Sequence, residues 1–595
     1  MKIDMSISGL KQAYLEGSLT PAKLLASIRE QAVTLSDHNI WIYLLTETEH
    51  QPYLDALATK DPATTPLWGV PFAIKDNIDL AGVATTNGCD AFAYKPAESS
   101  QVVQQLIDAG AIPIGKTNLD QFATGLNGTR SPHGPCHNAF DFDYISGGSS
   151  AGSSVSVAKG LATFSLGTDT AGSGRVPACF NNLVGLKPTR GLLSASGLVP
   201  ACRSLDCISI FALNSDDANS VLACAEGFDS RANPFNNQNR QYGRRGGALK
   251  IGVLTEEHLQ FFGDQAYAAT YAATLEKLAA TGIELVTIDY TPFNEAALLL
   301  YEGPWVTERY LAAQPLIDDN PEAIFPVVRE IIAPGGKPPA TALFKAQYRL
   351  EELKKACHDQ LKGLDCLLTP TAGRLFTIAE MLEEPILRNS QLGYYTNYMN
   401  LVDMTSVAVP TAFTEAGLPF GITLVGPAFS DRALLSIANR IQQTLPLPQG
   451  ALDLPQPALS GQAVGNPDSI DVLVCGAHLE GLPLNWQLLE RGAVLKQHTQ
   501  TSPHYLMYAL AGGPPLRPGL IRDEAAGVAI EVEIWSMPKS EFGSFVAGIP
   551  APLGIGKVQI ADGSWVCGFI CEPYGLEGSS DISALGGWRA YMAQR

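Results

Sequence analysis

The fold of this chain follows from two small-residue segments, Gly147-Gly148-Ser149-Ser150-Ala151-Gly152-Ser153-Ser154 and Gly167-Thr168-Asp169-Thr170-Ala171-Gly172-Ser173-Gly174. Upstream of both lies Val70-Pro71-Phe72-Ala73-Ile74-Lys75, an apolar run that ends on a lysine. The run is typical of a buried strand that enters a buried loop. Together the three segments supply a nucleophilic hydroxyl, a second hydroxyl, an amine and a row of backbone N–H donors.

These groups are the parts that cleavage of an amide bond requires. A hydrolase without a metal ion needs an activated nucleophile and fixed donors for the oxyanion. Ser173 lies in a Gly/Ala turn where successive N–H groups can converge on one point. The only histidines near it are His133 and His137, in a separate Pro/Gly loop. We therefore predict a buried, neutral Lys75 as the base, with a second serine passing the proton, because desolvation lowers the pKa of lysine.

Each segment also has a simpler interpretation. A Gly/Ser-rich stretch is often a flexible loop, and a lysine is often a solvated surface residue. The order of the three elements, with Lys75 at the end of an apolar run, favours the catalytic interpretation.

The quoted segments resemble those of the amidase signature enzymes, and the spacing between the two serines agrees. The resemblance implies Ser173 as the nucleophile, Ser149 as the bridging serine and Lys75 as the proton acceptor. It also implies a cis peptide bond between Gly148 and Ser149. The oxyanion donors that it implies are the backbone N–H groups of Thr170, Ala171, Gly172 and Ser173.

Other segments resemble one branch of that family, the allophanate hydrolases. They are Ala171–Ala178, Asp120–Leu126 and Tyr301–Tyr310, and the resemblance extends over nearly the whole chain. It implies allophanate as the substrate. Because allophanate is a small, planar ureido anion, its site needs one cation and several hydrogen-bond donors.

The resemblance assigns Tyr301 and Arg309 to the substrate carboxylate, and Thr124 and Gly125 to the pocket wall. Gly303-Pro304 indicates a helix start, which places Tyr301 just before a helix and Arg309 inside it. Without the resemblance, an ordinary amphipathic helix with surface Tyr and Arg would be favoured. Arg175 could bind substrate or brace the loop through hydrogen bonds, and we favour the bracing role.

Composition limits the classes of protein. With 595 residues, 46% hydrophobic and 17% charged, the chain is globular and larger than one ordinary domain. Its net charge of -19 argues against nucleic-acid binding. The eleven cysteines form no CxxC pair and no zinc pattern, so we expect reduced thiols, no metal and no cofactor. Neither a signal-peptide core nor an apolar run of about 18 residues is visible, so we expect a cytoplasmic protein away from membranes. We also expect a homodimer.

Residues 1–445 alternate short apolar runs with helical stretches. This alternation predicts an α/β fold, and the resemblance implies a mixed sheet wrapped by helices. The expected strands are Leu249–Leu254, Cys366–Leu368, Val407–Ala412 and Gly421–Val425, and the expected helices are Gln101–Ala109, Ala268–Thr281 and Ala342–Lys362. Residues 446–468 are rich in Pro, Gly, Gln and Ser, which predicts a linker.

Residues 469–595 predict a second, smaller, β-rich domain. Its expected strands are Ile470–Val474, Tyr505–Leu510, Val528–Trp535 and Val558–Ile560. Its size and the motif Gly476–Asn485 resemble the C-terminal domain of full-length allophanate hydrolases, which has a γ-glutamylcyclotransferase-like fold. The resemblance implies that this domain handles the first product.

A two-step reaction is chemically reasonable. Attack at the ureido carbonyl would release ammonia and leave N-carboxycarbamate, which must still lose carbon dioxide. A proton delivered to nitrogen helps that loss, and we predict His478, on a loop after a strand, as its donor. Glu533 could assist this step, but its place in an alternating run favours a side chain that faces solvent. The alternative is a domain that serves oligomer assembly alone.

Two rival functions are carried forward. One is another amidase of the same family, including a component of a tRNA-dependent amidotransferase, against which the acidic charge and the added domain argue. The other is a catalytically silent scaffold, which the intact Lys75, Ser149 and Ser173 argue against.

Overall fold

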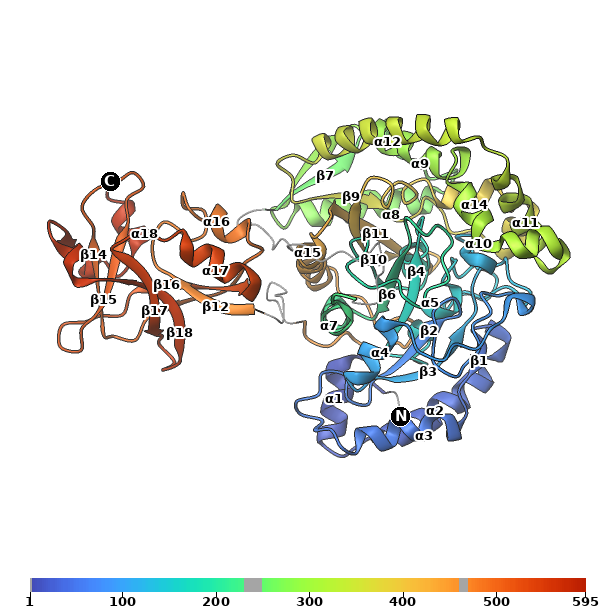
Figure 1. Cartoon of the computed structure of the whole chain (residues 1–595), viewed down its shortest axis with the longest axis horizontal. Coiled ribbons are helices and arrows are strands. Elements are labelled where there is room, and N and C mark those ends of the chain that lie inside the picture. Colours follow the sequence, from blue (N-terminus) through green and yellow to red (C-terminus); the bar gives the residue numbers. More distant parts are fainter. Residues whose placement is uncertain (1–2, 230–248, 460–468) are drawn as a thin grey trace. The chain divides into compact units, whose positions relative to one another are not determined.

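The computed structural model describes residues 3–229, 249–459 and 469–595, which form two compact units (Figure 1). The described residues up to 459 make the first unit, and residues 469–595 make the second. The first has a mixed sheet covered by helices and the second is rich in strands, which confirms the predicted fold class.

One mixed sheet of eleven strands forms the centre of the first unit. Parallel pairs join β2 to β3 and β4, and β7 to β8 and β9, whereas the strands between these two groups run antiparallel. In sheet order the strands are β1 (Trp41–Leu44), β3 (Ile112–Thr117), β2 (Pro71–Lys75), β4 (Phe164–Asp169), β6 (Cys207–Ala212), β5 (Val184–Lys187), β10 (Met404–Phe413), β11 (Pro419–Pro427), β9 (Cys366–Pro370), β7 (Lys250–Leu254) and β8 (Glu284–Ile288).

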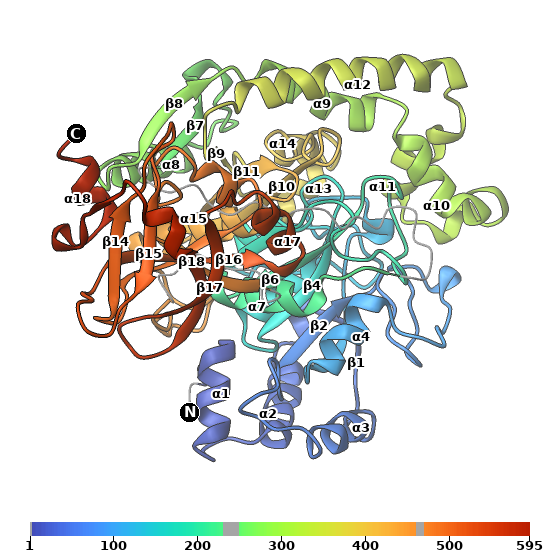
Figure 2. The same cartoon turned by 60° about the vertical axis from the view of Figure 1, so that its left-hand side comes forward.

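Helices surround this sheet at both ends and on its faces. At one end α1, α2 and α3 lie near β1 and β3, and at the other α9 and α12 lie near β7 (Figures 1 and 2). The helices of the unit are α1 (Ile7–Leu15), α2 (Pro21–Thr34), α3 (Glu47–Leu57), α4 (Gln101–Asp108), α5 (Ala151–Ala158), α6 (Val176–Phe180), α7 (Ser215–Ala225), α8 (Gln265–Ala279), α9 (Thr291–Glu302), α10 (Val306–Asp319), α11 (Pro326–Ile332), α12 (Ala340–Gln360), α13 (Ile378–Glu383), α14 (Leu387–Leu392) and α15 (Asp431–Thr444).

The strands β2 and β4 bring the catalytic segments together. They run parallel, with Ile74 opposite Leu166, so their carboxyl ends reach the same edge of the sheet. All residues of both strands are buried, including the charged Lys75 and Asp169 at their carboxyl ends. The helix α5 packs on both strands, so Lys75, the loop before α5 and the loop after β4 meet at that edge.

Hydroxyl groups fasten α5 to these strands. Ser153 Oγ donates to Leu166 O at 2.9 Å, and it also lies 2.7 Å from Thr117 Oγ1. Ser150 Oγ donates to Thr168 O at 3.2 Å. Buried hydroxyls need such partners, because an unpaired buried polar group costs about 1–3 kcal/mol. Several serines of the Gly/Ser segment are therefore structural.

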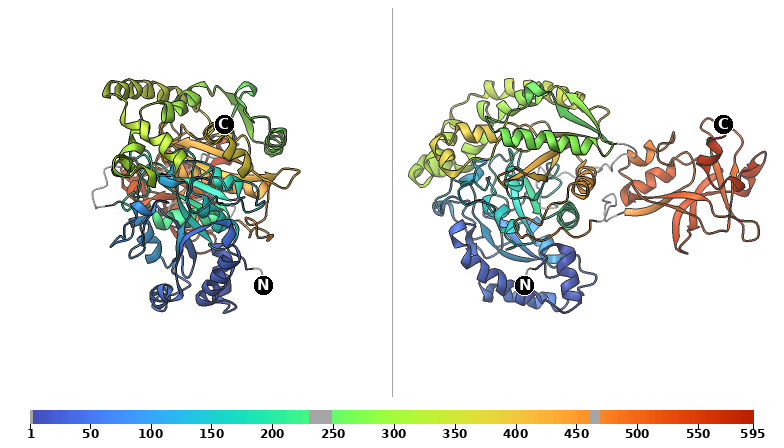
Figure 3. Two further views of the ribbon diagram at one scale, coloured as in Figure 1. Left: turned by 90° about the vertical axis from the view of Figure 1, so that its right-hand side faces the viewer. Right: turned by 180° about the vertical axis from the view of Figure 1, so that it is seen from behind.

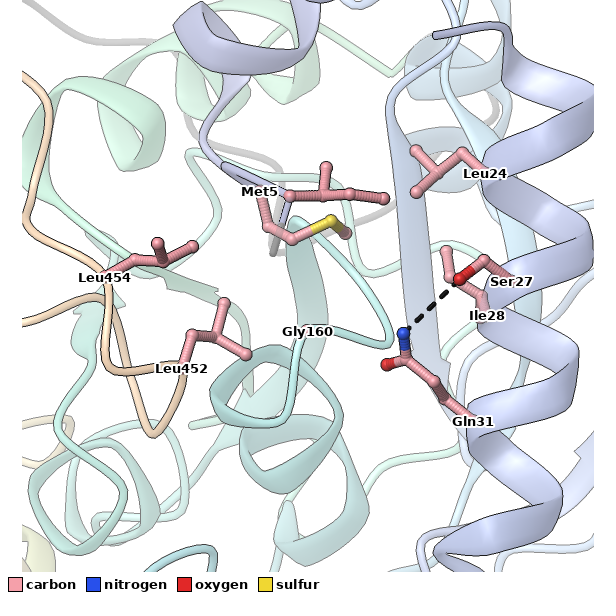
Figure 4. A pocket seen from close by; sticks show the side chains of 9 residues that line it. Met5, Leu24, Ser27, Ile28, Gln31, Gly160, Leu452 and Leu454 are labelled. Atoms are coloured by element: carbon pink, nitrogen blue, oxygen red, sulfur yellow. Dashed lines mark hydrogen bonds between the residues drawn. The ribbon is translucent and has the colours of Figure 1, made fainter. Parts of the chain in front are cut away.

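Residues 446–459, predicted to be linker, instead pack on the first unit. Ala451 N donates to Ala158 O at 2.9 Å, and Asn182 Nδ2 donates to Gly450 O at the same distance. Figure 4 shows Leu452 and Leu454 facing Met5 and α2 across an apolar pocket. The leucines and these fixed polar contacts hold a segment that lacks regular periodicity. The rest of the predicted linker, residues 460–468, lies outside the described residues.

The second unit has a sheet of five strands and a sheet of three (Figure 3). Its core is formed by aliphatic side chains and the buried Trp535 and Trp588. The five strands, in order, are β13 (Val494–Gln500), β16 (Glu531–Pro538), β12 (Ser469–Val474), β18 (Trp565–Cys571) and β17 (Leu553–Gln559); the three are β15 (Pro518–Arg522), β14 (Tyr505–Ala509) and β19 (Ser580–Asp581). Its helices are α16 (Trp486–Leu489), α17 (Lys539–Ala547) and α18 (Trp588–Met592).

All eleven cysteines lie in the described part of the chain as free thiols, and most of them are buried. Among the described helices, each is too short or too polar to cross a bilayer.

We expect Gly152→Ala to lower the free energy of unfolding by about 1–3 kcal/mol, the usual cost of overpacking a dense core. A Cβ at Gly152 would collide with the carbonyl oxygen of Ile40 and lie 2.9 Å from Asn118 N, and backbone cannot move aside cheaply. Urea unfolding would measure the change. The control is Gly543→Ala in α17, where the same methyl group meets no described atom within 4 Å; equal losses in both variants would contradict the explanation.

Candidate active site

Lys75 is fully enclosed in the candidate site. It is the last residue of β2, and its side chain has no exposed surface. Its Nζ donates to Ser149 Oγ and to Thr168 Oγ1, each at 2.7 Å. The amine is therefore held between a hydroxyl from the loop before α5 and a hydroxyl from β4.

Burial lowers the pKa of Lys75 to about 7, because the charged ammonium cannot be hydrated there. The carboxylates of Asp120, Asp206 and Asp169 act in the opposite direction, and burial exceeds their effect. A substantial fraction of the lysine is then neutral near pH 7. When the amine is neutral, the contact with Ser149 can run the other way, with the serine hydroxyl donating to Nζ.

The peptide bond between Gly148 and Ser149 is cis, as the resemblance implied. Ser173 is buried beside it in the second segment, and its Oγ donates to Gly125 O at 3.5 Å. Among the described residues no hydrogen bond joins Ser149 Oγ to Ser173 Oγ. Catalytic contacts of this kind are often open in ligand-free enzymes.

The loop after β4 offers backbone donors, but Gly172 is not a free one. Its N–H donates to Asp169 Oδ1 at 2.8 Å, which corrects the prediction that it binds the oxyanion. Gly172 has φ 141°, a conformation that favours glycine, and this turn directs its amide to the carboxylate. In the described chain no hydrogen bond uses the N–H groups of Thr170, Ala171 or Ser173, so these three stay available for the predicted oxyanion role.

Arg175 braces this loop. Its Nε donates to Asp169 Oδ2 at 2.8 Å and its Nη2 to Asp169 Oδ1 at 2.9 Å, with both side chains fully buried. Burial alone would raise the pKa of Asp169, but the guanidinium holds it below its ordinary value. The same carboxylate also accepts Gly172 N and Gly174 N, so one ion pair fixes both sides of Ser173.

The four predicted substrate residues converge beside Ser173. Arg309 Nη1 donates to Thr124 Oγ1 at 3.1 Å, and its Nη2 donates to Tyr301 Oη at 3.1 Å. Thr124 precedes Gly125, whose carbonyl accepts the Ser173 hydroxyl. Arg309 is only 2% exposed, and its Nε has no partner among the described residues. A buried cation with a spare donor thus lies one loop away from the nucleophile.

The helix assignment around these residues needs one correction. Tyr301 does lie before α10, but it belongs to the last turn of α9, which continues to Glu302. Arg309 lies in α10, as predicted. The Gly303-Pro304 break separates the two helices and lets Arg309 reach back over the ring of Tyr301, 5.1 Å from its centroid.

Three residues near the site were not predicted from the sequence. Thr168 accepts the second hydrogen bond of Lys75. Asp206 accepts the Thr170 hydroxyl and the amides of the 201–202 turn, and burial raises its pKa. Arg130 Nη1 donates to Thr124 O at 2.9 Å and so supports the segment that carries Thr124 and Gly125. Thr168 lies in the segment Gly167–Gly174, but the local sequence does not indicate which hydroxyl faces the amine of Lys75 on another strand.

His478 lines a cavity of about 270 Å³ in the second unit. It follows β12, as predicted, and stacks on Phe569 with ring centroids 5.1 Å apart. Its Nε2 lies 2.9 Å from Gln487 Oε1. Burial lowers its pKa, so the ring is neutral near pH 7 when the cavity holds no anion.

Glu533 does not face solvent, which corrects the favoured prediction. It is 1% exposed and accepts hydrogen bonds from Glu480 N at 2.8 Å and from Trp535 Nε1 at 3.0 Å. Arg589 Nη2 donates to it at 2.7 Å. Glu533 is not among the residues that line the cavity of His478, so its contacts fasten the loop and the C-terminal helix to β16.

Comparisons with known proteins identify the family of each unit. Residues 25–435 match the Amidase family model, and residues 470–593 match the model described as allophanate hydrolase C-terminal domain. A solved allophanate hydrolase of Kluyveromyces lactis is 39% identical, with a TM-score of 0.83 and full coverage of both chains.

Two curated relatives differ from this chain in length. The urea amidolyase of Saccharomyces cerevisiae is 42% identical over 99% of this chain and 33% of its own length. The chain thus spans about a third of that relative. A glutamyl-tRNA(Gln) amidotransferase component of Synechococcus is 33% identical over 65% of this chain and 86% of its own length.

We expect the rate at which a fluorophosphonate labels Ser173 to rise with pH through a midpoint near 7. The neutral form of Lys75 activates the serine, and its pKa of about 7 sets the window. Above that pH the rate should level off, and Lys75→Met should reduce it by about 100-fold or more, as loss of a general base does. Mass spectrometry of the labelled protein at each pH measures the rate. A profile that rises only near pH 10 would show that Lys75 stays charged.

Proposed function

The chain belongs to the amidase family, and from this premise we propose that it hydrolyses allophanate to ammonia and carbon dioxide in two steps. The observation that carries the proposal is the buried Arg309 beside Tyr301 and Thr124, next to the loop that contacts Ser173. A lone buried cation needs an anion, and allophanate brings a carboxylate at a short distance from its amide. The match of nearly the whole chain to a solved allophanate hydrolase supports the same substrate.

The first step uses the groups of the first unit. Ser173 Oγ attacks the ureido carbonyl carbon while its proton passes through Ser149 to the neutral Lys75. The N–H groups of Thr170, Ala171 and Ser173 stabilise the oxyanion. The C–N bond then breaks, and the proton returns to nitrogen, which leaves as ammonia. Water hydrolyses the acyl-enzyme by the reverse relay and releases N-carboxycarbamate.

The second step belongs to the second unit. The cavity of His478 would accept N-carboxycarbamate, a small dianion, and the imidazolium would donate a proton to its nitrogen. One C–N bond breaks, its electron pair stays on nitrogen, and carbon dioxide leaves with carbamate, which decomposes to ammonia and carbon dioxide. If the second unit served only oligomer assembly, the His478 imidazole in this cavity would have no chemical role.

The rival functions have less support. Membership of an amidotransferase complex does not account for the second unit, since the relatives of that type cover between 64% and 74% of this chain. A silent scaffold does not account for a fully buried lysine held between two hydroxyls. The homodimeric state and the cytoplasmic location stay predictions.

We expect Arg309→Gln to reduce kcat/KM for allophanate by about 30-fold or more, because a buried charge-assisted contact with the carboxylate is lost. Biuret, in which a neutral amide replaces the carboxylate, should show little change. Ammonia release from both substrates measures the effect. An equal loss for both compounds would contradict the assignment of Arg309. As a control, Ser173→Ala should stop ammonia release from either substrate.

We expect His478→Asn to separate the two steps. The first ammonia should still form, while the appearance of carbon dioxide should lag behind it, because the proton donor of the second step is absent. Ammonia and carbon dioxide are followed in the same reaction at pH 8, where spontaneous loss of carbon dioxide from carbamates is slower. A carbon dioxide trace that keeps pace with wild type would favour a purely structural second unit.

A further inference from the structure

The cavity of His478 carries positive charge without any acidic neighbour. Its walls are mainly apolar, with Leu484, Ile549, Leu553 and Phe569 among them. No aspartate or glutamate lines it among the described residues, although the chain has a net charge of -19. The one cationic side chain in its lining is Arg517, which directly precedes β15. A cationic cavity in an acidic protein selects an anion.

Arg517 is available to a ligand, whereas the nearby Arg491 is not. In the described chain no hydrogen bond or ion pair engages the guanidinium of Arg517. Arg491 Nε donates to Ser544 Oγ at 3.0 Å and its Nη1 to Gln487 O at 3.0 Å, and Arg491 does not line the cavity. Both arginines lower the pKa of the His478 ring. They carry the same charge, but they differ in whether the guanidinium is available to a ligand.

The orientation of the His478 ring fixes which nitrogen can take a proton. The oxygen of the Gln487 amide can only accept, so Nε2 carries hydrogen and donates to it at 2.9 Å. The remaining nitrogen, Nδ1, has the free lone pair. Phe545 of α17 and Phe569 of β18 cover the ring, and the charged groups that face it are Arg491 and Arg517.

We propose that Arg517 is the anion-binding residue of this cavity, holding one carboxylate of a small dicarboxylate-like dianion so that its central atom reaches His478. This inference rests on the proposed second step. A guanidinium binds a carboxylate through two parallel N–H···O bonds, which fixes both position and orientation. The other carboxyl group is then the one that departs as carbon dioxide.

Arg517 also couples binding to proton uptake. In the free protein, burial, Arg491 and Arg517 all lower the pKa of His478. A bound dianion neutralises Arg517 and adds negative charge beside the ring, which raises that pKa. His478 therefore takes a proton at Nδ1 when the dianion arrives. The proton passes to the nitrogen of N-carboxycarbamate as its C–N bond breaks, and the ring returns to its neutral form.

Malonate tests the proposal by calorimetry on the full chain. It has a CH₂ group where N-carboxycarbamate has NH, so it binds as a dianion without reacting. We expect two sites, one per unit. Arg517→Gln should weaken one site by about 30-fold or more, as loss of a charge partner does, and Arg309→Gln should weaken the other. Arg491→Gln, which removes the same charge near His478, should change neither site by more than about 3-fold.

Titrations in two buffers of different ionisation enthalpy measure the coupling. At pH 7.5, wild-type protein should take up a fraction of a proton at the site that Arg517→Gln removes, and His478→Asn should abolish that uptake. Unchanged malonate binding in Arg517→Gln, an equal loss in Arg491→Gln, or binding without proton uptake would overturn the proposal. Ammonia release from allophanate is scored separately, so failure of the first step would contradict the proposed function without changing the malonate result.

Discussion

Removal of the Lys75 amine from water is the constraint on which the candidate active site depends. A lysine with no exposed surface can be neutral near pH 7 only because its charged form is not hydrated, and three nearby carboxylates do not offset that loss. The sheet provides this enclosure by placing β2 and β4 side by side under α5, so that serine and threonine hydroxyls are the amine's partners. A more open site would leave Lys75 protonated and Ser173 inactive.

The loop after β4 shows how one buried ion pair sets the position of several groups. Asp169 is paired with Arg175 and also accepts two backbone amides on either side of Ser173. Breaking such a pair would leave a buried charge without a partner, which costs about 3–5 kcal/mol. The loop is therefore held in place, while in the described chain the amides of Thr170, Ala171 and Ser173 make no hydrogen bond of their own. Preorganised donors of this kind stabilise an oxyanion without reorganising during the reaction.

Each unit places an arginine at its candidate site in a chain that is acidic as a whole. The buried Arg309 contacts Thr124, next to the residue that accepts the Ser173 hydroxyl, and the half-buried Arg517 lines the cavity of His478. The net charge of -19 does not prevent anion binding, because salt screens the field of an exposed charge over a distance of about 10 Å. The local arginine decides what enters each site. The proposed reaction, which converts an anion to a dianion, would use one such arginine in each step.

The sequence by itself determined the local elements and the inventory of reactive groups, because periodicity, turn residues and motif spacing act over short distances. Strands such as β7 and β9, helices such as α4 and α12, and the roles expected of Lys75 and Ser173 could be read from it. Only the tertiary structure decided which groups are free. Gly172 donates to Asp169, Glu533 is buried, residues 446–459 are packed, and Thr168 and Arg517 face reactive side chains. The physical reason is that hydrogen bonding and desolvation depend on neighbours distant in sequence, as with Ser149 and Lys75, 74 positions apart.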